Sequence, residues 1–264
     1  MQYTVLTLFP EISEAYFSSS IIAKAVERGL ISYRTINIRD FALDKHRSCD
    51  DAPYGGGPGM LMLAEPLGRA LEAAGAQANA AGNREGKRVI YLSPSGRPFN
   101  QDLARELSAE KELILLCGRY EGIDQRIIDT YVDDEVSVGD YILSSGDVAA
   151  LVLIDATYRL LEQVITPSSL EEESFDQGLL EYPQYTRPVE YATLKVPEVL
   201  ISGHHENIRR WRLEKRIEKT LIHRPDLIRH GEEHNLFSNE VRKIIEEKRL
   251  TIQSGQVSEK DERD

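Results

Sequence analysis

The sequence predicts an α/β domain with a mostly parallel sheet, followed by a small helical C-terminal domain. Short β-prone apolar runs alternate with helical patterns as far as Leu161, which is typical of strands joined by crossover helices. After Leu161 the chain continues with a polar acidic stretch, a proline-rich stretch and helical patterns. The expected boundaries are 1–162 for the first domain, 163–178 for a linker, 179–250 for the helical domain and 251–264 for a disordered tail.

Each expected strand is a short β-prone run, and each expected helix carries apolar residues at helical spacing. Strands are expected at 3–9, 31–38, 88–92 and 112–117. The last run, ELILLC, is apolar enough to be buried on both faces of a parallel sheet. Asn100 is a plausible N-cap for the helix that follows it. Helices are expected at 12–30, 65–74, 101–110, 123–131, 147–161, 208–224 and 240–250, and the stretch 136–143 is expected to be extended or looped.

Composition excludes several classes of protein. Of the 264 residues, 41% are hydrophobic and 29% are charged, which excludes a low-complexity chain. The longest apolar run, 148–154, is far shorter than the ~20 residues of a membrane-spanning helix. The N-terminal segment lacks the basic start of a signal peptide, and Cys49 and Cys117 are too few for a disulfide framework or a cysteine-rich zinc site. We therefore expect a reduced, cytoplasmic protein that does not contact a membrane.

The charge is distributed unevenly along the chain. The net charge of −12 argues against indiscriminate binding of nucleic acid, and DNA is not an expected partner. The segment 203–230 is the exception, because it holds eight Lys and Arg against four Asp and Glu, together with four of the six histidines. It predicts a local basic surface in the second domain.

Three loops rich in small or turn-forming residues follow expected strands, at 93–96, 118–122 and 137–146. Ligands bind outside the carboxyl ends of the strands in an open parallel sheet, and glycine lets the backbone approach a ligand closely. The loops therefore predict a pocket for a nucleoside-like ligand, although ordinary tight turns are the alternative. No dinucleotide fingerprint or P-loop is present. The glycine-rich segment 54–60 indicates a mobile lid or a surface for close approach of a substrate.

Seven motifs follow one another along the chain: PYGGGPGM, YLSPSG, LCGRYEGID, SVGDYILSSGD, SF-x-x-GLLEYPQYTRP, PEVLISGHH and RRWR. Together they closely resemble the bacterial tRNA (guanine-N1)-methyltransferases of the TrmD type, from about residue 1 to 250. The resemblance implies a SPOUT-class catalytic domain with a deep trefoil knot, and a homodimer with shared active sites. It implies S-adenosyl-L-methionine as methyl donor, with assistance from Mg²⁺, although no ligand spacing fixes a metal site. The implied product is 1-methylguanine at tRNA position 37, 3′ of the anticodon, which supports reading-frame maintenance.

The resemblance also assigns residues to the donor and to the tRNA. The basic helical domain would grip the anticodon branch, and Lys215 and Arg216 are further candidates for phosphate contacts. Trp211 is expected in the core, as is Cys117. The implied donor-binding residues are Tyr91, Leu92, Ser93, Pro94, Gly96, Gly118, Glu121, Val138, Gly139, Asp140, Tyr141, Ile142 and Leu143. The implied substrate-binding residues are Asp50, Tyr54, Gly59, Arg119, Ser174, His205, Arg209, Arg210 and Arg212.

Methyl transfer to guanine N1 requires a base, because N1 of neutral guanine carries a proton. The family has an Asp before the Ser-Phe of the linker motif as this base, whereas this sequence has Glu173, so that Glu172 and Asp176 stay open as alternatives. Arg159 matches the arginine that assists at the guanine, where negative charge develops on O6. A simpler interpretation of Arg159 is an arginine at a helix C-terminus, where its positive charge complements the helix dipole.

Three other functions stay open at this point. One is a SPOUT enzyme that methylates another RNA position, such as a ribose oxygen. Another is an RNA-binding module that has lost catalysis, for which the Glu at position 173 is the one indication. The third is a small-molecule α/β enzyme with a nucleotide cofactor, against which the missing fingerprint motifs argue.

Overall fold

The computed structural model of this chain describes residues 1–77, 86–164 and 173–261. The chain divides into two compact units, Met1–Ile165 and Thr166–Asp264, and each is described by itself. Residues 165–172 of the expected linker lie outside the described residues. In the part of the chain that is described, no helix has the length and apolar character needed to cross a membrane.

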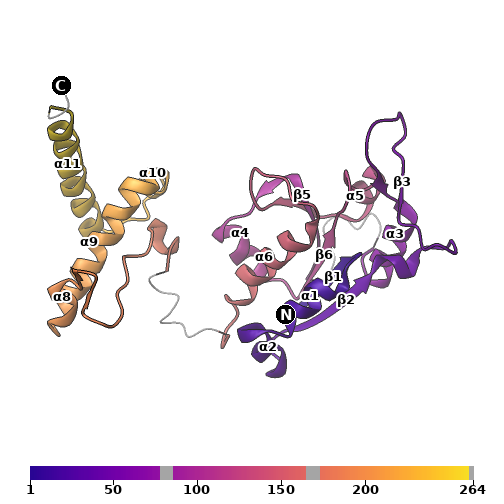
Figure 1. The fold of residues 1–264 in the computed structure, drawn as a ribbon, viewed down its shortest axis with the longest axis horizontal. Helices are drawn as coiled ribbons and strands as arrows, with labels where there is room; N and C mark the ends of the chain where they lie inside the picture. The colour runs from indigo at the N-terminus through magenta and orange to yellow at the C-terminus, as the bar shows by residue number, and fades with distance from the viewer. Residues whose placement is uncertain (78–85, 165–172, 262–264) are drawn as a thin grey trace. The chain divides into compact units, whose positions relative to one another are not determined.

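A five-stranded parallel sheet forms the centre of the first unit (Figure 1). Its strand order is β2-β1-β6-β5-β7, and each neighbouring pair is parallel, as the sequence predicts. All residues of β6 are buried, so the run ELILLC lies in the middle of the sheet. The strands are β1 (Gln2–Thr7), β2 (Ser32–Asn37), β5 (Lys87–Pro98), β6 (Glu112–Cys117) and β7 (Asp134–Ser137), beside a small hairpin of β3 (Asp50–Asp51) and β4 (Leu61–Met62).

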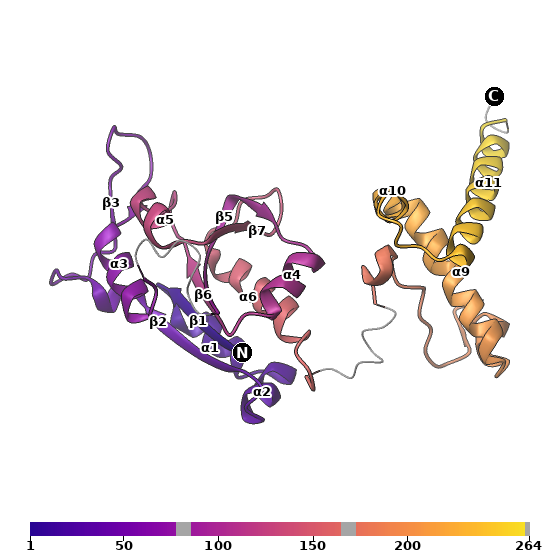
Figure 2. The ribbon, with the colours of Figure 1, turned by 180° about the vertical axis from the view of Figure 1, so that it is seen from behind.

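Helices cover both faces of this sheet and make a three-layer fold (Figures 1 and 2). Successive residues of a strand point to opposite faces, so Leu113 and Leu115 join one core and Ile114 and Leu116 join the other. The first core is covered by α1 (Pro10–Phe17), α2 (Ser20–Glu27), α4 (Gln101–Ser108) and α6 (Gly146–Tyr158). The second is covered by η1 (Ile38–Phe41), α3 (Ala64–Ala73) and α5 (Gln125–Tyr131).

The expected single helix at 12–30 is two helices, α1 and α2. Ser18 and Ser19 separate them, and their hydroxyls donate to the carbonyls of Glu14 and Ala15. Such local bonds compete with continuation of a helix. The expected cap at Asn100 is present, since its side chain accepts a hydrogen bond from the Leu103 N–H at 2.9 Å.

The second unit is mainly helical, and its core includes Leu179, Ile217, Ile228 and Phe237. The helix α10 is not among the expected helices, and it begins at a proline, a favourable first helical residue. The expected tail is also helical as far as Asp261, because helix-forming residues outnumber its single glycine and no proline interrupts it. The elements are η2 (Asp176–Gly178), β8 (Glu190–Tyr191), β9 (Leu194–Lys195), α8 (Glu198–Ile201), α9 (His205–His223), α10 (Pro225–Glu233) and α11 (Asn239–Asp261).

Candidate functional site

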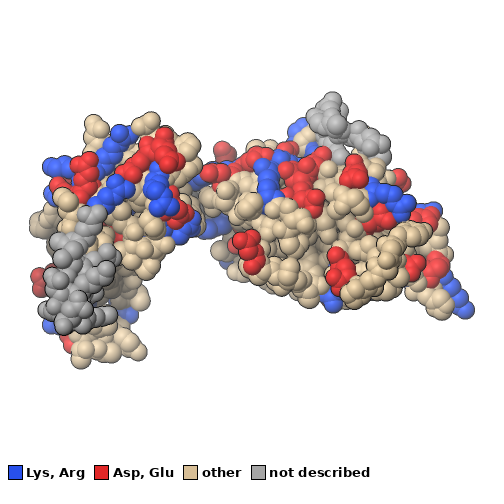
Figure 3. Space-filling model, turned by 90° about the horizontal axis from the view of Figure 1, so that it is seen from above, with Lys and Arg blue, Asp and Glu red and all other residues tan. Residues whose placement is uncertain are grey.

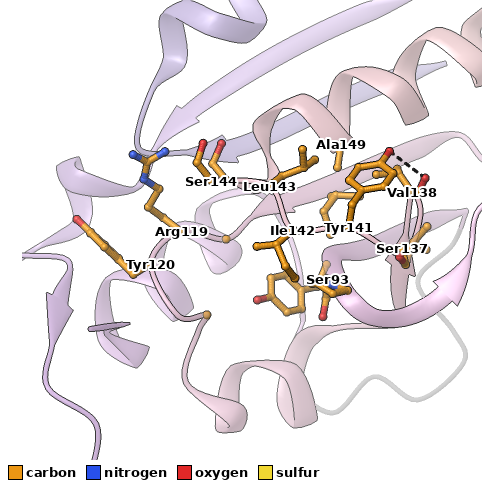
Figure 4. A pocket seen from close by; sticks show the side chains of 18 of the residues that line it. Ser93, Arg119, Tyr120, Ser137, Val138, Tyr141, Ile142, Leu143, Ser144 and Ala149 are labelled. Carbon is orange, nitrogen blue, oxygen red and sulfur yellow. Dashed lines mark hydrogen bonds between the residues drawn. The ribbon is translucent and has the colours of Figure 1, made fainter. Parts of the chain in front are cut away.

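A cavity of about 220 Å³ lies at the carboxyl ends of β6 and β7 and beside residues 91–94 in the middle of β5, and these three strands lie side by side in the order β6-β5-β7. All three of the expected ligand loops line it. In Figure 4, Arg119 and Tyr120 lie at one end, Val138 and Tyr141 at the other, and Ile142 between them. The expected donor-site residues all line this cavity except Gly96 and Asp140. Two further lining residues without an assigned role, Val136 and Ala149, lie outside the three expected loops. The lining residues that lie in these loops but had no assigned role are Tyr120, Gly122, Ser137, Ser144, Ser145 and Gly146.

The first wall of the pocket is a loop inside β5. Leu92 and Arg97 both pair with Val136 of β7, so the four residues between them loop out toward the cavity. Gly96 allows this loop to pack closely on β7, because a Cβ atom at this position would lie 2.3 Å from the backbone nitrogen of Val136. Gly96 therefore shapes the pocket by close backbone packing rather than by lining it.

The floor of the pocket is the contact between the end of β6 and the first turn of α6. The Gly146 N–H donates to the Gly118 carbonyl at 2.8 Å, and a Cβ atom on Gly146 would lie 2.9 Å from the Cα of Cys117. Beneath them the buried Asp147 accepts a hydrogen bond from Thr7 Oγ1 at 2.5 Å. Burial, and secondarily Asp147, raises the pKa of the Cys117 thiol, which fits the expected core role of this cysteine.

The third wall is the loop after β7. Tyr141 folds back over Gly139, with its N–H donating to the Gly139 carbonyl at 2.9 Å and its hydroxyl to the Val138 carbonyl at 3.2 Å. The Ile142 side chain remains 82% exposed at the cavity. Main-chain polar groups and apolar side chains thus share the lining, a combination that suits a nucleoside-like ligand.

The glycine-rich segment meets this pocket at one edge. The Glu121 N–H donates to the Met60 carbonyl at 3.0 Å, and a Cβ atom on Gly59 would lie 2.3 Å from Glu121 Cγ. Burial and then a hydrogen bond to Asp50 raise the pKa of Tyr120, so Asp50 also adjoins a lining residue. The structure therefore brings Asp50 and Gly59 to the pocket edge, whereas Tyr54 is fully exposed.

The two candidate arginines of the first unit occupy different places. Arg119 lines the cavity, and its guanidinium lies 5.1 Å from the centre of the Phe9 ring. Arg159 is the C-cap of α6, whose first turns contribute Ser145, Gly146 and Ala149 to the cavity. At 1.5 Å per residue the helix puts Arg159 about 15 Å from Ala149. An arginine side chain is too short to span that distance, so the structure does not bring Arg159 to the pocket.

Glu173 and Ser174 belong to the second unit, where they begin its described part. Ser174 Oγ accepts a hydrogen bond from the Glu181 N–H at 3.1 Å, and the Phe175 N–H donates to the Leu179 carbonyl at 2.8 Å. Glu173 is half-buried. The alternative base Glu172 lies outside the described residues.

Most of the expected phosphate-binding residues lie on α9 and already have acidic or aromatic partners. Arg209 is 2.8 Å from Glu206 and 3.0 Å from Glu240, and the Arg210–Glu214 distance is 2.9 Å. Figure 3 shows Lys and Arg interspersed with Asp and Glu on the viewed face of this unit. His205 is exposed, and the Arg212 guanidinium lies 4.8 Å from the Tyr182 ring centre.

Two residues of α9 differ from expectation. Arg216 is buried and donates to the Leu180 carbonyl at 3.3 Å, so the expectation that it contacts phosphates is wrong. Trp211 is only half-buried, and its ring centre lies 6.3 Å from that of Tyr185.

Residues 1–77, 86–164 and 173–261 contain no group of three or more His, Cys, Asp or Glu that could hold a metal ion.

A family model and several known proteins match this chain over most of its length. The family model described as tRNA (Guanine-1)-methyltransferase TrmD matches residues 1–230. A protein of Treponema denticola named tRNA (guanine-N(1)-)-methyltransferase is 62% identical over 94% of this chain and 98% of its own length. Proteins of the same name from Treponema pallidum and Borrelia hermsii are 56% and 57% identical, over 94% and 86% of this chain and 96% and 92% of their own lengths. The chain therefore belongs to the tRNA (guanine-1)-methyltransferase TrmD family.

Proposed function

We propose that this protein transfers a methyl group from S-adenosyl-L-methionine to N1 of guanine 37 in tRNA, and that the cavity at β5, β6 and β7 binds the donor. The observation that carries the proposal is the convergence of three loops on one pocket in a chain of this family. The names of the relatives favour this reaction over ribose methylation, a binding-only module or a small-molecule enzyme. The proposal puts the enzyme in the cytoplasm with its tRNA, where it would support reading-frame maintenance.

The chemistry needs a base and a charge-stabilising group. When bound, S-adenosylmethionine supplies an electrophilic methyl group on a sulfonium. Glu173 takes the proton from guanine N1, and the bond from N1 to the methyl carbon forms as the carbon–sulfur bond breaks. The guanidinium of Arg159 stabilises the negative charge that develops on O6. The described residues do not group as a Mg²⁺ site requires, so no step of this proposal uses the metal.

We also propose that the active site is shared between the subunits of a homodimer. The separation of about 15 Å between Arg159 and Ala149 along α6 supports this, because one subunit cannot bring Arg159 to its own pocket. The outer face of α6 leaves Val148 53% and Val152 42% exposed, as a face that packs on a second copy would. The second unit would hold the anticodon branch through His205, Arg209, Arg210 and Arg212.

A deep trefoil knot is the final part of the proposal. The close crossing of Gly96 over the Val136 backbone and the packing of Gly146 against Gly118 support it. Both contacts leave no room for a side chain, as expected where the chain passes tightly through its own loops.

The reaction is tested with labelled S-adenosylmethionine and a tRNA that carries guanine at positions 36 and 37. We expect incorporation that is lost when guanine 37 is replaced by adenine. Glu173→Gln should abolish turnover yet keep donor binding by calorimetry, whereas Glu198→Gln, an exposed matched control, should leave both unchanged. Incorporation that survives the change of guanine 37, or near-normal turnover of Glu173→Gln, contradicts the proposal.

The shared site is tested by mixing two inactive variants. Arg159→Ala removes the arginine, and Ile142→Asp puts a charge at the pocket. In a mixed dimer, one site keeps an intact pocket and an intact partner arginine, so refolding the two variants together at equal amounts should restore about a quarter of normal activity. If mixtures that are shown to contain the mixed dimer recover no activity, an active site shared in this way is excluded.

A further inference from the structure

Four charged side chains gather at the base of the loop 93–96. We name Arg88, Arg97, Glu106 and Asp134 the arginine clamp. The two arginines lie on β5, on either side of the residues that loop out. Asp134 begins β7, and Glu106 lies on α4. The clamp therefore joins both stems of the loop to two other elements of the fold.

Both arginines meet the same two carboxylates. Arg97 Nη2 lies 2.9 Å from Asp134 Oδ1 and 3.4 Å from Glu106 Oε1. Arg88 Nη1 lies 2.6 Å from that same Glu106 oxygen, and Arg88 Nε donates to Asp134 Oδ2. Because the side chains of Arg88 and Asp134 are only 19% and 13% exposed, their ion pair is less screened than one on an open surface.

The clamp acts on a loop that forms part of the pocket wall. Ser93 and Pro94 line the cavity, whereas none of the four clamp residues does. Within the loop, the Ser95 N–H donates to Ser93 Oγ at 3.2 Å, a contact between two loop residues that does not fix the loop to the sheet. The ion pairs at the two stems thus add to the backbone pairing of Leu92 and Arg97 with Val136 at the base of the loop.

We propose that Arg97 and Asp134 are positioning residues for the methyl donor: they hold the two stems of the loop 93–96 together, so that Ser93 and Pro94 have their binding positions before the donor arrives. A wall that is ordered in advance loses less conformational freedom on binding. The inference rests on the assignment of this cavity to S-adenosylmethionine. It predicts that the clamp affects donor affinity and leaves the chemical step unchanged.

The test compares Arg97→Met with Arg105→Met. Arg97→Met removes the contacts of Arg97 with Asp134 and Glu106, whereas Arg88 keeps its contacts with the same two carboxylates. Arg105→Met removes an exposed pair with Asp102 on α4, and is the matched control. By calorimetry on the folded full-length protein, we expect Arg97→Met to weaken S-adenosylmethionine binding about fivefold, as for the loss of one partly buried ion pair. Arg97→Lys should recover part of the affinity, and Arg105→Met should bind normally.

Kinetics separate positioning from a general loss of structure. Arg97→Met should raise KM for the donor and leave kcat at saturating donor and KM for tRNA unchanged, with faster hydrogen exchange confined to the amides of Ser93, Ser95 and Gly96. A variant that is less thermally stable but binds the donor normally overturns the inference. If Ile142→Asp, inside the pocket, also binds the donor normally, the assignment of the cavity fails instead.

Discussion

Gly96→Ala would place a methyl group against the backbone of the neighbouring strand β7. The new Cβ would lie 2.3 Å from the Val136 nitrogen and 2.4 Å from the Glu135 carbonyl carbon. Both are backbone atoms of β7, so neither can rotate away, and the contact must open to at least about 3 Å. That movement stretches the adjacent hydrogen bond from the Phe99 N–H to the Ser137 carbonyl, now 2.7 Å. Overpacking of this kind costs about 1–3 kcal/mol, and we expect the upper end.

Urea unfolding followed by circular dichroism, at one fixed protein concentration, measures this cost. Gly68→Ala is the matched control, because it adds the same methyl group in the interior of α3, where the Cβ would make an ordinary 3.6 Å contact with Ile127 Cδ1. It should raise the free energy of unfolding by up to about 1 kcal/mol through helix propensity. For Gly96→Ala we expect a loss of about 3 kcal/mol and much weaker donor binding. If Gly96→Ala is as stable as Gly68→Ala, the described close packing of Gly96 on the backbone of β7 is wrong.

Three further predictions concern single contacts in the first unit. Thr7→Val should lower the free energy of unfolding by about 1–3 kcal/mol in urea unfolding, because it leaves the buried Asp147 without this donor; an unchanged midpoint contradicts it. Asn100→Ala should cost about 1 kcal/mol by removing the side-chain acceptor for the Leu103 N–H, and Asn100→Asp should restore most of it. The hydrogen bond from Arg88 holds the pKa of Glu106 below its ordinary 4.5, so its stabilisation is present above that pH and is lost as pH falls through the lowered folded-state pKa. Between about pH 5 and pH 3, unfolding free energy should therefore fall more steeply for the wild type than for Glu106→Gln, and equal slopes contradict this.

The sheet could be predicted from the sequence because its signals are local. The run ELILLC coincides with β6, and Asn100 caps α4 as expected. The break between α1 and α2 depends on two serine side chains that bond back to the preceding turn, and apolar spacing does not report such bonds. The helix α10 is short, and its first-residue proline and its many charged residues conceal its few apolar positions.

The pocket loops could be found because small residues after parallel strands have a recognisable pattern. The clamp could not be found, because its members are separated by up to 46 positions and meet only after β5, β7 and α4 pack together. Arg216 shows the opposite error: a basic residue in a basic segment is buried, and it satisfies a backbone carbonyl. Charge in the sequence does not tell which side of a helix faces solvent.

The place of β6 in the strand order has a consequence for synthesis on the ribosome. The first strand made, β1, needs β6 as its second neighbour, and β6 is about a hundred residues further along the chain. Until residue 117 has emerged, β1 can pair with β2 alone, and its other edge stays open. Such nascent chains are prone to aggregate and fold slowly. Chains truncated before β6 should therefore require chaperones or be degraded, and the first unit should acquire protease resistance only after β5, β6 and β7 are all available.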